Sequence, residues 1–214
     1  VFGGVWNYYD IRSARLSSAT SATEVAPSQY ASVLILQIDN WIWSDADKQL
    51  ASVNLTEFSA IVLEIRSGGG DYLASQIIVE ELQRSGKPIV AHVEMAMSGA
   101  FYISQVADYI FINPNAIYGF YHNKTGDWGK GHGIEELWRG IFNKVAYVTS
   151  SKRGIPLSEV EEMLGNVYSG EKSLQLKLVD QFGSYDDAVR YATAIAAVKT
   201  HLPVTMFKVI NLGW

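Results

Sequence analysis

Short apolar runs alternate with amphipathic segments through the middle of the chain. Residues 72–85 carry apolar side chains at helical spacing and stop at Gly86, so they predict a helix with a glycine cap. Apolar runs of four to six residues predict strands buried on both faces. Four such runs, in chain order, are Val33–Ile38, Ala60–Ile65, Ile89–Val93 and Tyr109–Ile112. Strand and helix therefore alternate, which favours an α/β domain whose mostly parallel sheet is covered by helices.

The second half of the chain predicts more helices than strands. Pro114-Asn115 predicts a turn before a fifth strand at Ile117–Tyr121, and the glycine-rich stretch His122–Gly133 predicts a loop. Apolar spacing predicts helices over Gly99–Ala107, Ile134–Lys152, Leu157–Leu164, Gly170–Leu178 and Asp186–Val198, and a last strand over Val204–Ile210. We expect an N-terminal arm or linker over residues 1–32, one folded domain over 33–200 and a C-terminal tail with a strand over 201–214.

Composition and charge exclude several classes of protein. The 214 residues are 48% hydrophobic and 18% charged, which is enough apolar material for a core. The net charge is −5 and no block of Lys and Arg occurs, so nucleic acid is not expected as a partner. The chain has no cysteine, which excludes disulfides, a cysteine metal site and a thiol nucleophile.

The sequence also gives indications of where in or outside the cell the protein acts. No apolar run is long enough to span a membrane. The chain starts at Val1 without an initiator Met, and we interpret it as a mature or trimmed form from which a signal peptide or anchor was removed. Together with the lack of cysteine, this favours an exported or membrane-associated protein slightly over a cytoplasmic one.

Two junctions after predicted strands carry the candidate chemistry. Ser98 stands between a strand and a helix and is followed by Gly99 and Ala100, while Gly68–Gly70 follow the strand before it. A serine on such a turn is an exposed nucleophile with backbone N–H groups nearby, and a glycine allows a substrate carbonyl to approach the backbone. Ser98 with the Gly99 N–H, and Gly69 or Gly70 for a second N–H, could form an oxyanion hole. Taken singly, the serine turn is explained at least as well by a packing contact, and a glycine run is more often a flexible turn; the pairing of the two motifs favours the catalytic interpretation.

Several motifs together resemble signal peptide peptidase A and its relatives, in the superfamily of the Clp protease proteolytic subunit and the crotonases. The likeness covers residues 33–190. It rests on these segments: Ile65-Arg66-Ser67-Gly68-Gly69-Gly70, Lys87-Pro88-Ile89-Val90-Ala91, Ala96-Met97-Ser98-Gly99-Ala100-Phe101-Tyr102-Ile103, Asn113-Pro114, Val167-Tyr168-Ser169-Gly170-Glu171 and Gly183-Ser184-Tyr185.

The resemblance implies a ClpP/crotonase-type spiral of ββα units. It implies that Ser98 is the nucleophile and that the N–H groups of Gly70 and Gly99 form the oxyanion hole. Two positions depart from the family pattern. Gly68 replaces a proline in the usual Ser-Pro-Gly-Gly, and Ala100 replaces a second glycine after the serine. A loop without the proline is less rigid.

The general base has two candidates. Signal peptide peptidases use a lysine near the start of a long helix, which points to Lys130, with Lys124 second and Lys144 too far along the helix. Such a lysine must be partly desolvated so that its pKa falls toward neutrality. The Clp proteolytic subunit instead has a histidine near the position of His122, and a histidine is a good base near neutral pH. Asn166 would then stand near the third, orienting position.

Other residues give weaker signals. We expect His92, inside the third strand, to be a packed and hydrogen-bonded core residue. His122, His132 and Asp127 do not have a recognised metal-ligand spacing, so no metal site is expected. Trp41, Trp43, Trp128 and Trp138 could line an apolar substrate groove, but core packing or an oligomer interface is the commoner explanation for each.

The sequence therefore predicts a serine endopeptidase that resembles signal peptide peptidase A and needs no cofactor. Its substrate would be a peptide or protein, and the resemblance implies a homo-oligomer, placed near a membrane by the removed N-terminal segment. The alternatives are a catalytically silent scaffold or peptide-binding protein of the same fold, and a crotonase-like acyl-CoA enzyme, which uses paired oxyanion N–H groups without a serine nucleophile.

Overall fold

One sheet organises the described part of the chain, which in the computed structural model comprises residues 30–121 and 132–212. Within it the strand order is β5-β4-β3-β2-β1-β7, and β6 pairs with β4. All pairs are parallel except β4 with β5. The strands are β1 (Ala31–Ile42), β2 (Ala60–Gly70), β3 (Ile89–Met97), β4 (Tyr109–Gly119), β5 (Tyr168–Ser169), β6 (Gln181–Phe182) and β7 (Val204–Asn211).

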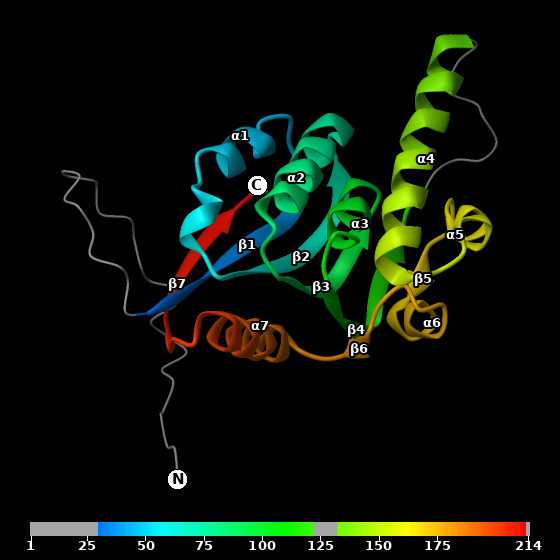
Figure 1. Cartoon of the computed structure of the whole chain (residues 1–214). Helices are drawn as coiled ribbons and strands as arrows, with labels where there is room; N and C mark the ends of the chain where they lie inside the picture. The colour runs from blue at the N-terminus through cyan, green and yellow to red at the C-terminus, as the bar shows by residue number, and fades with distance from the viewer. Residues whose placement is uncertain (1–29, 122–131, 213–214) are drawn as a thin grey trace.

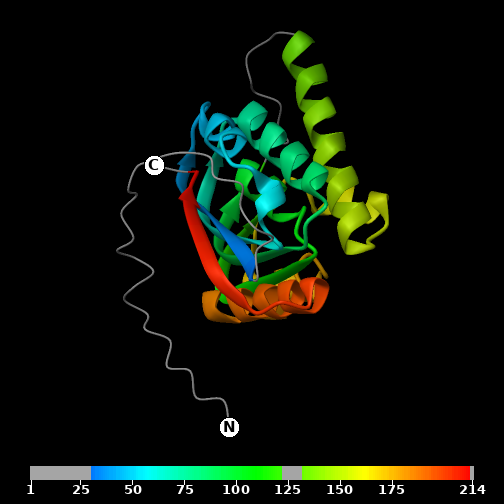
Figure 2. The same ribbon diagram turned by 60° about the vertical axis from the view of Figure 1, so that its left-hand side comes forward.

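Helices cover both faces of this sheet (Figures 1 and 2). They are α1 (Ala46–Ala51), a 3-10 turn η1 (Leu55–Glu57), α2 (Tyr72–Ser85), α3 (Gly99–Ser104), α4 (His132–Arg153), α5 (Leu157–Met163), α6 (Gly170–Gln175) and α7 (Tyr185–Thr200). On one face, α2 and α3 pack on strand residues such as Leu34 and Leu63; on the other, α7 packs on Val33 and Val62. The α/β sheet covered by helices is as predicted, because strands buried on both sides need apolar residues throughout.

Helix α2 follows the predicted bounds, since both of its ends are encoded locally. The Asp71 carboxylate accepts the Ala74 N–H at 2.8 Å, and Gly86 ends the helix with φ of 61°. None of the described helices combines the length and the apolar character that crossing a membrane requires.

Several predicted strand boundaries were wrong. The strand expected to end at Ile65 continues through Gly70, and the two strands expected on either side of Pro114-Asn115 are one strand, β4. In β4, Val93 pairs with Ile112 but Met95 pairs with Ile117, so residues 113–116 bulge out of the ladder. A proline is tolerated in a bulge because no ladder hydrogen bond is needed there.

The C-terminal part of the chain is integrated into the sheet. The predicted last strand is confirmed as β7, which pairs in parallel with β1 at the edge of the sheet. Strand β1 begins at Ala31, two residues before the expected start, and helix α4 begins at His132, inside the predicted loop. The domain boundaries at residues 32 and 200 stay predictions.

A buried arginine joins the end of α4 to the sheet. The Arg153 side chain is 2% exposed; it donates to Asp180 Oδ2 at 2.6 Å and to the Ala107 carbonyl. The same Asp180 oxygen accepts the Ile110 N–H at 2.8 Å, so the ion pair is tied to the backbone of β4. Removing one partner of a buried pair leaves the other charge without compensation.

We therefore expect Arg153→Met to lower the free energy of unfolding by about 1–3 kcal/mol, because it leaves the Asp180 carboxylate, which is 32% exposed, and the Ala107 carbonyl without this donor. The neighbouring pair between Lys152 and Asp108 is a matched control, because these side chains are 30% and 50% exposed. Lys152→Met should cost no more than about 1 kcal/mol. Urea unfolding of both variants measures the difference; equal effects would show that burial of the Arg153 pair is unimportant.

Candidate active site

The two candidate turns meet at one edge of the sheet. Strands β2 and β3 are parallel neighbours, and their pairing ends with Ser67 opposite Ala96. Because the carboxyl ends of parallel strands lie at the same edge, the glycines after Ser67 and the serine after Met97 are brought together. Both helices that follow, α2 and α3, begin at this edge.

Ser98 occupies a strained turn. Its φ and ψ are 52° and −121°, a region that non-glycine residues seldom adopt, at a cost of roughly 1–3 kcal/mol. The Ser98 N–H donates to the Gly119 carbonyl at 3.1 Å, and the Ser98 carbonyl accepts the Tyr102 N–H at 3.1 Å. Its side chain is half-buried and makes no capping hydrogen bond to α3. The backbone thus fixes the residue, and the hydroxyl is not used for capping.

The glycines of β2 pack directly against this turn. A Cβ built on Gly69 would lie 2.8 Å from the Ser98 Cβ and 3.0 Å from the Gly99 nitrogen. A Cβ on Gly70 would lie 2.2 Å from the Ile42 carbonyl oxygen, so no side chain fits there. A Cβ on Gly99 would lie 3.7 Å from the Gly70 nitrogen. Glycine is therefore required sterically at positions 69 and 70, and the Gly70 and Gly99 backbones are neighbours.

The backbone donors at this edge differ in what they bind. The Gly69 N–H donates to the Ser67 hydroxyl at 3.1 Å, and the Asp71 N–H donates to the Ile42 carbonyl of β1 at 2.8 Å. Ile42 pairs with Gly70 in the parallel ladder and its carbonyl accepts the Asp71 N–H, so the Gly70 N–H points away from β1, to the side of the Ser98 turn. The Gly99 N–H belongs to the first turn of α3, where N–H groups have no helical partner.

Ser75 and a stacked pair of tyrosines pack around the turn, and the sequence alone predicted no role for them. The Ser75 hydroxyl donates to the Asp71 carbonyl at 2.7 Å and fills the space beside Gly99, where a Cβ would lie 2.4 Å from it. Tyr72 and Tyr102 stack with ring centroids 6.2 Å apart, and burial raises the pKa of both phenols. Apolar surroundings thus keep both tyrosines neutral. The sequence does offer a sign of this role: Ser75 stands four residues after Asp71, so one helical turn brings its hydroxyl to the Asp71 carbonyl.

Apolar side chains are exposed beside the glycines. Trp41 pairs with Gly69 across the sheet and is 52% exposed, and Trp43 is 51% exposed. Leu73, in the first turn of α2, is 63% exposed. Core packing therefore does not explain Trp41 and Trp43, whereas Trp138 packs partly against the core and Trp128 lies outside the described residues.

The candidate bases are mostly beyond what the structure describes. His122, Lys124 and Lys130 lie outside the described residues. Lys144 is exposed on α4. Asn166 follows α5, and its side chain is turned back to the end of that helix, because its amide donates to the Glu162 and Met163 carbonyls at 3.3 and 3.2 Å. Its backbone carbonyl lies against Gly119, where a Cβ would be 2.3 Å away, so Asn166 is near the strand end that binds the Ser98 N–H.

His92 is a core residue on the opposite face of the sheet. It is 5% exposed, and its ring lies edge-on to Tyr185 at the start of α7. Its packing is as predicted, but its Nδ1 is buried without a hydrogen bond to the described residues. Burial lowers the pKa of His92. The described residues contain no group of three potential metal ligands; His122 and Asp127 lie outside them.

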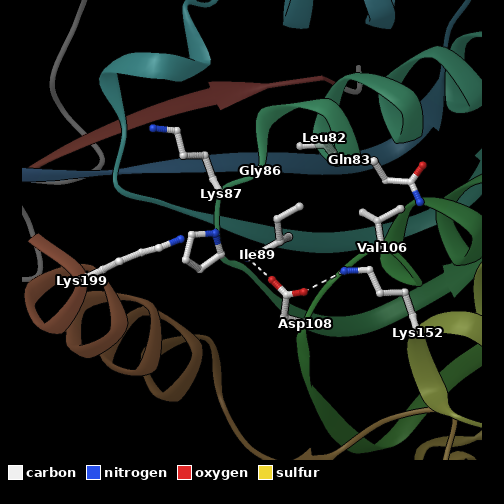
Figure 3. Close-up of a pocket in the computed structure, with 10 residues that line it drawn as sticks. Leu82, Gln83, Gly86, Lys87, Ile89, Val106, Asp108, Lys152 and Lys199 are labelled. Atoms are coloured by element: carbon white, nitrogen blue, oxygen red, sulfur yellow. Dashed lines mark hydrogen bonds and ion pairs between the residues drawn. The ribbon is translucent and has the colours of Figure 1, made fainter.

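A pocket of about 270 Å³ lies at the other end of β3 (Figure 3). It is lined by Ile89, Asp108 and three lysines, Lys87, Lys152 and Lys199. Ile89 begins β3, so this pocket is roughly 30 Å from Ser98 at ~3.3 Å per strand residue. Lys152 and Lys199 stand in the last turns of α4 and α7, where cations offset the negative end of the helix dipole. The favourable interaction with a helix C-terminus therefore explains why Lys152 and Lys199 stand here. The pocket lies away from the serine turn.

Known proteins resemble this chain in both sequence and fold. Residues 81–121, which include Ser98 and Gly99, match the model of peptidase family S49. Protease 4 of Haemophilus influenzae is 28% identical over 70% of this chain, and Protease 4 of Salmonella typhi is 28% identical over 65%. A putative protease of Synechocystis is 21% identical over 71% of the chain. The chain spans only 30% and 29% of the two Protease 4 relatives.

The solved structures of a membrane-bound stomatin-specific protease, 1510-N, share this fold. A serine-to-alanine mutant superposes with a TM-score of 0.60 at 18% identity, covering 85% of this chain and 97% of the other. A lysine-to-alanine mutant in complex with a substrate peptide gives a TM-score of 0.59 at 18% identity, covering 85% and 92%. The chain therefore has the ClpP-like fold of these proteases, and its resemblance to signal peptide peptidase A-like serine peptidases is confirmed.

Proposed function

We propose that this chain is a serine endopeptidase in which Ser98 is the nucleophile and the N–H groups of Gly70 and Gly99 form the oxyanion hole. The observation that carries the proposal is the strained turn at Ser98 in contact with the glycine end of β2. A strained turn persists only where the surrounding structure enforces it, and such turns cluster at active sites. The S49 match and the protease relatives support peptide-bond hydrolysis over acyl-CoA chemistry.

In the proposed reaction the Ser98 oxygen attacks the scissile carbonyl carbon while a base takes the hydroxyl proton. The carbonyl oxygen becomes an oxyanion that accepts hydrogen bonds from Gly70 and Gly99. The base then gives its proton to the leaving amine, which departs as the C–N bond breaks. Water then attacks the ester carbonyl carbon while the base takes its proton; the bond between the acyl carbon and the Ser98 oxygen breaks, that oxygen takes the proton back from the base, and the acid product leaves.

The base in this proposal is Lys130 or His122. A lysine there must have a pKa lowered by desolvation, whereas a histidine acts near neutral pH without such tuning. The solved peptide complex of the stomatin-specific protease carries a lysine-to-alanine substitution, which supports the lysine as the first candidate. Lys130→Ala and His122→Ala separate the two: the substitution that removes the base slows peptide hydrolysis strongly, and the other does not.

The substrate in this proposal is an extended peptide with apolar side chains. Pairing of β2 with β3 stops at Ser67, so residues 68–70 take no part in that ladder, and in this proposal a peptide strand pairs with this end of β2. Trp41, Trp43 and Leu73 offer exposed apolar surface around this position. The substrate-peptide complex of the stomatin-specific protease supports peptide binding by this fold. Cleavage of a peptide library tests the preference; charged residues around every cleavage site would contradict it.

We also propose that the chain acts as a homo-oligomer close to a membrane. The fold neighbour is described as membrane-bound, and the resemblance to signal peptide peptidase A implies assembly into an oligomer. Light scattering of the purified chain measures the mass, and a monomer at all concentrations would contradict the assembly. Flotation with vesicles tests the membrane proximity.

Covalent labelling is the direct test of the proposed nucleophile. We expect wild-type chain to react with a fluorophosphonate probe at one residue, Ser98, seen as a single mass adduct by intact-protein mass spectrometry. Ser98→Ala should take up no probe. If wild type stays unlabelled where a known serine peptidase is labelled, the endopeptidase proposal fails and a silent peptide-binding scaffold is the better description.

A further inference from the structure

We infer that Ser67 is a positioning residue that holds the oxyanion-hole glycine Gly70 in place, an inference that rests on the proposed function. Its side chain is fully buried, and its hydroxyl joins two backbone groups. It donates to the Asn40 carbonyl of β1 at 2.5 Å and accepts the Gly69 N–H at 3.1 Å. One hydroxyl therefore connects β1 to the glycine end of β2.

The two backbone groups lie where the β1–β2 ladder is interrupted. Asn40 pairs with Ser67 and the next residue, Trp41, pairs with Gly69, so Gly68 has no partner on β1. Gly68 is thus the extra residue of a bulge, and Asn40 adopts a positive φ of 60° at the same place. A bulge leaves ladder donors and acceptors without their regular partners, and buried groups of this kind need a substitute. The Ser67 hydroxyl is the substitute partner for both the Asn40 carbonyl and the Gly69 N–H.

The bulge determines where the Gly70 N–H points. After the extra residue, Ile42 pairs with Gly70 and its carbonyl accepts the Asp71 N–H, so the Gly70 N–H points to the Ser98 side. In a ladder without the bulge, the same residues would be shifted by one position and the N–H would point to the other strand. Ser67 stabilises the bulged register and therefore acts on the oxyanion hole without touching the substrate.

The composition of this segment makes the hydroxyl more important. Gly68, Gly69 and Gly70 restrict the backbone little, and no proline limits the first of them. The Gly69 carbonyl is 3.5 Å from the same hydroxyl, longer than the 2.5 Å to the Asn40 carbonyl, so the donor is directed to β1. Without the hydroxyl, nothing in the side chains of residues 67–70 fixes this register.

The test uses four variants of the whole chain. Ser67→Ala removes both hydrogen bonds, Ser67→Cys keeps the volume but bonds weakly, and Ser67→Thr keeps the hydroxyl. Ser173→Ala is the matched control, because Ser173 on α6 is also fully buried and donates to a backbone carbonyl, that of Ser169 at the end of β5, at 2.8 Å. Activity is measured on dye-quenched casein, and binding on a trileucine aldehyde and the corresponding trileucine alcohol. Only the aldehyde can form a tetrahedral adduct whose oxygen occupies the oxyanion hole.

We expect Ser67→Ala and Ser67→Cys to lower kcat about 10- to 100-fold with little change in KM, as for a displacement of about 1 Å in a catalytic group. Aldehyde affinity should fall by a similar factor, and affinity for the alcohol should stay the same. Ser67→Thr should restore most of the activity, and Ser173→Ala should match wild type.

Two results would overturn the inference while leaving the proposed function intact. One is wild-type kcat and aldehyde affinity in Ser67→Ala; the other is an equal loss of aldehyde and alcohol binding, which indicates general damage to the fold. Circular dichroism checks folding, and if Ser67→Ala does not fold, the comparison of Ser67→Cys with Ser67→Thr decides. If wild type itself neither cleaves casein nor reacts with fluorophosphonate, the proposed function fails and this inference with it.

Discussion

Replacing Ser98 with alanine should lower peptide hydrolysis by roughly 10⁴-fold or more, because no other group can replace the nucleophile. The substitution removes one oxygen and leaves the turn intact. The hydrogen bond from the residue 98 N–H to the Gly119 carbonyl and the contact with Tyr102 are made by the backbone, so they persist in the variant. The loss should therefore appear in kcat, with the folded structure preserved.

The measurement is initial rate on casein at saturating substrate, with thermal unfolding as the check on folding. Ser85→Ala is the control, because Ser85 closes the far end of α2, where its hydroxyl donates to the Leu82 carbonyl at 2.6 Å. We expect the control to retain wild-type activity. More than about a tenth of wild-type activity in a folded Ser98→Ala would show that Ser98 is not the nucleophile.

Gly70→Ala should be the second most damaging change, with kcat about 10²–10³-fold lower, the effect of losing one oxyanion donor. The added Cβ would lie 2.2 Å from the Ile42 carbonyl oxygen and 2.6 Å from the Ile42 nitrogen, both backbone atoms. The φ of 156° at Gly70 is also unfavourable for a side chain. Strands β1 and β2 must then separate, which moves the Gly70 N–H away from the substrate carbonyl.

Gly68→Ala, two residues earlier, is the matched control for this prediction. A Cβ there would lie 3.8 Å from the tip of the Met97 side chain, an ordinary contact. We expect Gly68→Ala to retain activity within about threefold of wild type, because neither donor moves. Equal losses in the two variants would show that any added side chain in this segment is harmful, and would remove the special role of Gly70.

The sequence predicted the elements whose limits are set locally. Helix α2 has its cap in Asp71 and its stop in Gly86, and both are visible in the sequence. Ser98 was recognised because a strand, a small-residue turn and a helix follow one another there. The α/β class followed from apolar runs that need burial on both sides.

What the sequence did not predict depends on neighbouring strands. The extension of β2 through Gly70, the bulge at Gly68 and the continuity of β4 through Pro114 are all defined by pairing with another strand, which no local pattern records. Ser67 was part of a recognised motif, but its role needed the position of Asn40, 27 residues away. The base stays a prediction, because His122 and Lys130 belong to a stretch without apolar periodicity and outside the described residues.

The bulge at Gly68 has a consequence for how this segment tolerates change during evolution. The direction of the Gly70 N–H depends on the number of residues between Ser67 and Asp71, since each residue reverses the side to which the next donor points. Exchange of the side chain at Gly68 is sterically permitted, whereas gain or loss of a single codon there would reorient the donor. Alignments of related chains should thus allow variation at this position and exclude gaps beside it.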